Sequence, residues 1–160
     1  MPFVYTDQLA TPGNLTTSGT PNTETEAFFL KPGSTRSLYL AAVQIGGKGG
    51  GVTQLSGISL RVFKWGTAST AGTALSIVAK DASMPAATIT GSSRPTSGTT
   101  RTNAGPIVTC GATSPGVPWV ALNPDHMVSL AAGNAGSISA MDSGAVASMP
   151  YEFSLEHQEW

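Results

Sequence analysis

The stretch YEFSLE at residues 151–156 alternates apolar and polar side chains without a break. In an extended chain this alternation places Tyr151, Phe153 and Leu155 on one face and Glu152, Ser154 and Glu156 on the other. A period of two is typical of a β-strand that buries one side. The stretch therefore predicts a half-buried strand with Phe153 and Leu155 in the core.

The same period recurs upstream, between Leu55 and Trp65. Ile58, Leu60 and Val62 point one way in this segment, and the residues between them point the other way. We expect Ile58, Leu60 and Val62 to face the same core as Phe153 and Leu155.

Turn residues separate several further apolar runs, which we expect to be short strands at 26–30, 37–45, 88–90, 107–110, 117–122, 127–130 and 138–140. The run 74–79 fits either a strand or one helical turn. No long stretch keeps a helical period, and about eight or nine short strands are typical of sandwiches and jelly rolls. The sequence thus predicts an all-β fold, a single antiparallel β-sandwich of jelly-roll type.

The composition agrees with one β-rich domain. Charged residues are 11% of the 160 residues and hydrophobic residues are 40%, with a net charge of −1. The charged fraction is well below the roughly 25% of an average globular protein, and with the many turn residues it argues against a helical bundle. The hydrophobic fraction argues against a fully disordered chain.

Residues 10–25 are a low-complexity stretch of mostly Thr, Pro, Gly, Asn and Ser. A stretch with so few apolar residues cannot bury a face, so we expect residues 10–25 to be ordered only against a partner. They would belong to an extended N-terminal arm over residues 1–25. Phe3, Val4 and Tyr5 could form a short strand that docks elsewhere or on a neighbouring subunit. The β-sandwich domain would then span residues 26–160.

Charge is unevenly distributed along the chain. Residues 27–101 contain all eight Lys and Arg residues, whereas residues 102–160 contain five acidic ones. These charges either pair across the folded surface or form a basic patch that meets an acidic partner or sister subunit. Eight basic residues are too few for a nucleic-acid-binding face, and no segment approaches the about 18 apolar residues of a transmembrane helix. We expect neither nucleic acid nor a membrane as a partner.

No motif carries catalytic chemistry. Lys48 in the glycine-rich run 46–51 is followed by Gly49, so the hydroxyl ligand of a phosphate-binding loop is missing. His126 lies in a turn sequence, and His157 is expected in solvent or at a subunit contact. Glu152 and Glu156 are roughly 13 Å apart along a strand, too far for a carboxylate pair. The sequence therefore predicts no enzyme, no catalytic residue, no cofactor and no metal site.

Three tryptophans are candidates for a sugar-binding platform or for core packing: Trp65, Trp119 and Trp160. Core packing is the simpler interpretation for the first two. Trp160 follows the polar run His157-Gln158-Glu159, so it either folds back on its own domain or contacts a partner. The residues predicted to contact a partner are Phe3, Tyr5 and Trp160.

Four segments carry a family resemblance: SLYLAAV at 37–43, LRVFKWGTASTAGTA at 60–74, WVALNPD at 119–125 and MPYEFSLE at 149–156. Together they resemble the capsid cement, or decoration, proteins of tailed bacteriophages, which are virion structural proteins with jelly-roll folds. The resemblance spans about residues 37–156 and brings no active-site residues with it.

The resemblance implies a protein that binds the outer surface of an icosahedral head and clamps neighbouring capsomers. Its partners would be the major capsid protein and copies of itself, as trimers or dimers, and its location would be the capsid surface of the virion. A receptor- or carbohydrate-binding module of a tail fibre or tail tip is the alternative. A sandwich with exposed aromatic residues would serve that role as well.

Overall fold

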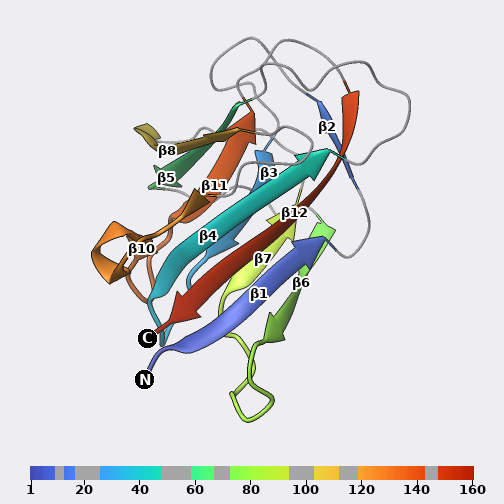
Figure 1. Cartoon of the computed structure of the whole chain (residues 1–160). Coiled ribbons are helices and arrows are strands. Elements are labelled where there is room, and N and C mark those ends of the chain that lie inside the picture. Colours follow the sequence, from blue (N-terminus) through green and yellow to red (C-terminus); the bar gives the residue numbers. More distant parts are fainter. Residues whose placement is uncertain are drawn as a thin grey trace.

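The protein is all-β and antiparallel, as the sequence predicts. The computed structural model describes residues 1–9, 13–16, 26–47, 59–66, 73–93, 103–111, 119–142 and 148–160. Among these residues the one helical element is a short 3-10 turn, η1 (Pro124–His126). Every strand pairing within them is antiparallel (Figure 1).

The strands of the described residues form two halves. The front half contains β1 (Phe3–Leu9), β2 (Gly13–Thr16), β4 (Leu38–Gly47), β6 (Thr73–Ala79), β9 (Trp119–Val120), β10 (Val128–Leu130) and β12 (Ser148–Glu159). The back half contains β3 (Glu26–Lys31), β5 (Ser59–Trp65), β7 (Thr90–Ser93), β8 (Asn103–Gly111) and β11 (Ser137–Asp142).

The two halves are joined through β6. The strand order is β10-β4-β12-β1-β6-β7-β3-β11-β5-β8, with β2 added beside β12 and β9 beside β4. Leu75–Ala79 of β6 pair with β1, whereas Thr73 and Ala74 pair with β7. The hydrogen-bonded ladder is therefore one continuous sheet, and Figure 1 shows the back half curling behind β4, β12 and β1.

The hydrophobic core lies between the two halves. Phe28 of β3 and Phe153 of β12 meet across it with ring centroids 5.3 Å apart. Around this pair, buried aliphatic side chains from both halves pack together, including Leu30, Leu40, Val43, Val62, Ile138 and Leu155. Burial of these side chains is the main favourable term in folding.

The predicted core positions are confirmed where the structure describes them. Val62, Phe153 and Leu155 are all buried. Ile58 and the side chain of Leu60 lie outside the described residues. The run 74–79, which fitted either a strand or a helical turn, belongs to strand β6.

The N-terminal segment differs from the predicted arm. Strand β1 is an interior strand of the front half, between β12 and β6, and Tyr5 is only 1% exposed. Residues 13–16 also pair, as β2, with β12. The domain therefore includes residues 3–9 and does not begin at residue 26. The composition of the polar stretch 10–25 wrongly suggested that the residues before it also belong to an arm. The strand at residues 3–9 pairs with β12 and β6, which are far away in sequence, so no local pattern indicates that it belongs to the sheet. Residues 10–12 and 17–25 lie outside the described residues.

Deletion of residues 1–9 should therefore destabilise the fold strongly. The deletion removes the buried Tyr5 and the ladders to both β12 and β6, so we expect a loss of more than about 3 kcal/mol in the free energy of unfolding. Circular dichroism with thermal melting measures it. Removing only residues 1–2, which precede the strand, is the matched control and should change stability by less than about 0.5 kcal/mol. A sharp, unshifted melt after removal of residues 1–9 would restore the arm interpretation.

Candidate functional site

The outward surface of the front half is built from rows of side chains that cross the strands; we call it the outer face. Antiparallel partners directly opposite each other point to the same side of a sheet. The register places one such row across β6, β1, β12, β4 and β9, consisting of Val78, Thr6, Glu156, Ala42 and Val120. Residues more than 70 positions apart in the sequence thus form one surface.

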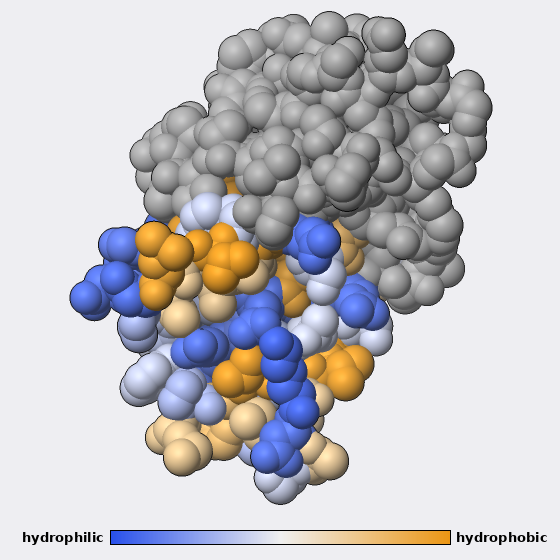
Figure 2. All heavy atoms as spheres, in the orientation of Figure 1, coloured by the Kyte–Doolittle hydropathy of each residue, from blue (hydrophilic) through white to orange (hydrophobic). Residues whose placement is uncertain are grey.

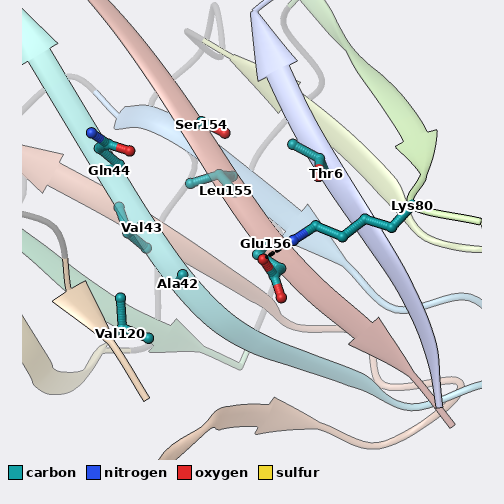
Figure 3. A pocket seen from close by; sticks show the side chains of 9 residues that line it. All are labelled: Thr6, Ala42, Val43, Gln44, Lys80, Val120, Ser154, Leu155 and Glu156. Atoms are coloured by element: carbon teal, nitrogen blue, oxygen red, sulfur yellow. Dashed lines mark hydrogen bonds and ion pairs between the residues drawn. The ribbon is translucent and has the colours of Figure 1, made fainter. Parts of the chain in front are cut away.

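Three rows of the outer face, those that contain Ser154, Glu156 and Gln158 of β12, are poor in charge. One flanking row contains Ser76, Gln8, Ser154 and Gln44, and the other contains Val4, Gln158, Tyr39 and Ser129. In these three rows Glu156 is the single charged residue. Lys80, just beyond β6, reaches across β1 and forms an ion pair with Glu156 (Figure 3). This pair neutralises the centre of the face.

A shallow pocket of about 170 Å³ opens beside this ion pair. It is lined by side chains of β1, β4, β9 and β12 together with Lys80, as Figure 3 shows. Pockets for drug-sized ligands are usually about 300–1,000 Å³. The depression is therefore better suited to receiving one protruding side chain than to enclosing a small molecule.

Exposed aliphatic side chains end the central row on both sides. Val78 is 59% exposed and Val120 is 57% exposed, and Leu122, shortly after β9, is 87% exposed. Figure 2 shows apolar side chains among hydrophilic ones on this side of the molecule. Depletion of charge with retained apolar area is the pattern of the central part of a protein–protein interface.

Two aromatic rings lie at the end of the outer face where the chain terminates. Trp160 is 56% exposed, and its ring packs against Tyr39 with centroids 6.1 Å apart and planes tilted by 59°. Backbone hydrogen bonds with Ser37 of 2.9 and 3.1 Å hold Trp160 in line with β12. The tilt means that the two rings do not form a flat platform for stacking a sugar. Trp119 packs against the hydrophobic core, and the side chain of Trp65 lies outside the described residues.

The three predicted partner contacts have different surroundings. Trp160 is exposed on the outer face, whereas Phe3 is half-buried under the guanidinium of Arg36, whose carbon lies 4.4 Å from the ring centroid. Tyr5 is packed inside the domain, and its hydroxyl donates a 2.9 Å hydrogen bond to the carbonyl oxygen of Pro85. Trp160 and part of Phe3 are thus at the surface of the isolated chain, and Tyr5 is not.

The opposite side of the same strands carries a group of buried ionisable side chains, here called the inner cluster: Asp7, His157 and Glu159, each with 0% exposure. The expectation that His157 lies in solvent or at a subunit contact is wrong. Strand β12 keeps its alternation beyond Leu155, so that His157 and Glu159 follow Phe153 and Leu155 on the inward side.

His157 lies between the two carboxylates. Its Nδ1 is 2.6 Å from Oδ2 of Asp7, and its Nε2 is 3.6 Å from Oε1 of Glu159. The register pairs His157 with Tyr5 of β1, and the two rings stack with centroids 5.0 Å apart. Asp7, two residues further along β1, reaches the imidazole diagonally.

Glu159 is held by two segments outside the strands. Its carboxylate accepts hydrogen bonds from the backbone N–H groups of Thr88 and Ile89 and from the Thr88 hydroxyl, over 2.8–3.2 Å. Arg36 adds an ion pair at 3.2 Å. Gly33 permits the close approach of Thr88, because a Cβ at residue 33 would lie 2.5 Å from the Thr88 carbonyl oxygen.

The electrostatics of the inner cluster follow from burial and these contacts. Burial raises the pKa of Asp7 more than its contact with His157 lowers it. Burial lowers the pKa of His157, but the contacts with Asp7 and Glu159 outweigh it, so that the net pKa is raised. For Glu159 the penalty of burial is outweighed by His157, Thr88 and Ile89, which lower its pKa to about 2.

The inner cluster cannot reach a substrate, since all three side chains are buried. Asp7 Oδ1 and His157 Nε2 have no hydrogen-bond partner within the described part of the chain. Among the described residues no group of three or more His, Cys, Asp or Glu side chains is arranged to hold a metal ion. No helix in these ranges is long and apolar enough to cross a membrane.

The other histidine, His126, is in the exposed turn that the sequence predicted. The side chain of Asn123 caps η1 by accepting a 3.1 Å hydrogen bond from the backbone N–H of Asp125.

Comparisons of the chain with protein-family models, with curated proteins and with solved structures gave no match.

Replacing Trp160 by Ala should change the stability of the dilute protein by less than about 1 kcal/mol. The indole is more than half exposed and its side-chain neighbours, Tyr39 and Gln158, lie at the surface, so little buried area is lost. Thermal or urea unfolding measures the change. Phe153→Ala, in the same strand but in the core, is the control and should cost about 3–5 kcal/mol. A comparable loss in both variants would show that Trp160 is part of the core.

Proposed function

We propose that this protein is a structural component of a tailed-bacteriophage virion, which binds the outer surface of the icosahedral head and stabilises the joints between capsomers. The resemblance of four segments to capsid cement proteins supports the proposal. The observation that carries it is the central row of the outer face, which is five strands wide, has a valine at each end and contains one charged residue, Glu156, which is paired with Lys80.

The finer fold assignment belongs to the same proposal. A jelly-roll-like sandwich has two sheets that face each other across one core. The front and back halves share such a core, and β6 passes from one half to the other as corner strands do in sandwiches. This arrangement supports a sandwich whose two sheets stay hydrogen-bonded along one corner.

Attachment to a shell would be mechanical. A stable protein–protein interface buries about 1,600 Å² in total, with few charges at its centre. A surface such as the outer face could lie on the major capsid protein and bury Val78 and Val120, with the charges of Lys80 and Glu156 paired to each other between them. Symmetry-related copies, as trimers or dimers, would strengthen attachment through multivalency.

The alternative, a carbohydrate- or receptor-binding module of the phage tail, is less well supported by the aromatic residues. Tyr39 and Trp160 lie side by side, but their rings are tilted by 59° and offer no common plane for a sugar. Binding to the head would involve a contact over the whole outer face, whereas a sugar would contact only the end of the face where Tyr39 and Trp160 lie.

Substitution of the outer face tests the assignment. Val78→Asp and Val120→Asp each place a charge at an exposed position, so folding should be retained, while binding to heads stripped of this protein should weaken about tenfold or more because a carboxylate would be desolvated in the contact. Ala132→Asp, at an exposed position in the turn between β10 and β11, is the matched control and should bind like the parent chain. Sedimentation of heads with bound protein gives the readout.

Two results would contradict the proposal. One is unchanged binding of both valine variants, which would remove the outer face from the contact. The other is a reconstruction of the virion that places this chain at the tail, in a few copies rather than in the hundreds that a head protein would have.

A further inference from the structure

The inner cluster connects four separate segments of the domain. Asp7 comes from β1, and His157 and Glu159 come from β12. Arg36 precedes β4, and Thr88 precedes β7. The contacts of one imidazole and one carboxylate thus join the N-terminal strand, the C-terminal strand and two connecting segments.

With Asp7 and Glu159 ionised, the charge of the inner cluster and Arg36 together balances only when His157 carries a proton. Asp7 and Glu159 then contribute two negative charges, and His157 and Arg36 contribute two positive ones. With a neutral imidazole, one negative charge remains uncompensated among buried groups. Removing one partner from a buried set of ion pairs is strongly destabilising, because the remaining charge has lost its hydration.

We propose that the inner cluster is a proton-controlled latch. When His157 is protonated, the contacts of the cluster keep β1 and the segment around Thr88 packed against the end of β12. When His157 is neutral, these contacts stabilise the packing less. The outer face is on the other side of these strands, so the latch is independent of the proposed function.

Apart from Asp7 and Glu159, the groups that face His157 do not supply a competing titration. Tyr5 of β1 covers one side of the imidazole, and burial together with the nearby Glu159 raises the pKa of its phenol, which stays neutral in the range concerned. From β4 the register brings Leu40 opposite His157, and from β6 it brings Ala79 opposite Tyr5; neither is charged. Arg36 faces Glu159 and remains a cation throughout.

The direction of the pH dependence follows from linkage. Because the pKa of folded His157 is raised above the ordinary 6.5, its stabilising contribution is complete below about pH 6.5 and is lost as the pH rises through the folded value. The raised pKa of Asp7 also makes stability fall with rising pH, from about 3.8 upward. Glu159 acts oppositely and at lower pH: its contribution is complete above 4.5 and is lost toward about 2.

The test is an NMR titration of the two imidazoles in the intact chain, combined with thermal unfolding between about pH 5 and pH 9. We expect the His157 signal to titrate above 6.5 and the melting temperature to fall by roughly 2–4 °C between about pH 6 and pH 8.5. His126→Gln is the matched control; it assigns the signals and should keep the same pH dependence. His157→Gln should lose most of it.

Three outcomes would overturn the latch. The first is a His157 signal that titrates at or below 6.5. The second is a melting temperature that does not fall over this interval in the parent chain, and the third is an equal fall in His157→Gln. If the His157→Gln variant does not fold, the NMR titration of His157 in the parent chain still tests the proposal, because it needs no substitution.

Discussion

The pairing of β12 with β1 along one side and with β4 along the other is the constraint on which the rest of the structure depends. β12 is the longest strand of the described residues, and β1, β2 and β4 all pair with it. Its register determines which side chains point inward and which point outward. A shift by one residue would exchange the two sets and expose Phe153 and Leu155 to water.

Neighbouring residues of β12 consequently have opposite surroundings. Glu156 points outward and pairs with Lys80 in the middle of the outer face, whereas His157 points inward and contacts Asp7. One strand therefore supplies both a contact surface and a buried, charge-balanced cluster. The two features can be tested separately, because substitutions on one side of the sheet leave the side chains of the other in place.

The sequence predicted much of the fold because alternation is a local property. The period of two identified β5 and β12, and apolar runs between turns identified most of the remaining strands. The inner cluster was missed for a physical reason: Asp7 and His157 are 150 positions apart, and a charged residue at an inward position looks like a solvated one until its partner is known. Continuing the alternation from Leu155 to His157 and Glu159 was the signal available. The outer face could not be predicted in the same way, because it depends on the register between strands that are distant in sequence, which no local pattern contains. The sequence did name Trp160 as a candidate partner contact, and its side chain is 56% exposed.

Native-state hydrogen exchange of the backbone amides tests most directly whether β1 is hydrogen-bonded between β12 and β6 in the front half. The account predicts that amides in residues 4–8 that donate to β12 or β6 exchange as slowly as those of β4 and β12, through the same global unfolding. Exchange of residues 4–8 at the rate of an unstructured peptide, with β4 and β12 still protected, would contradict it.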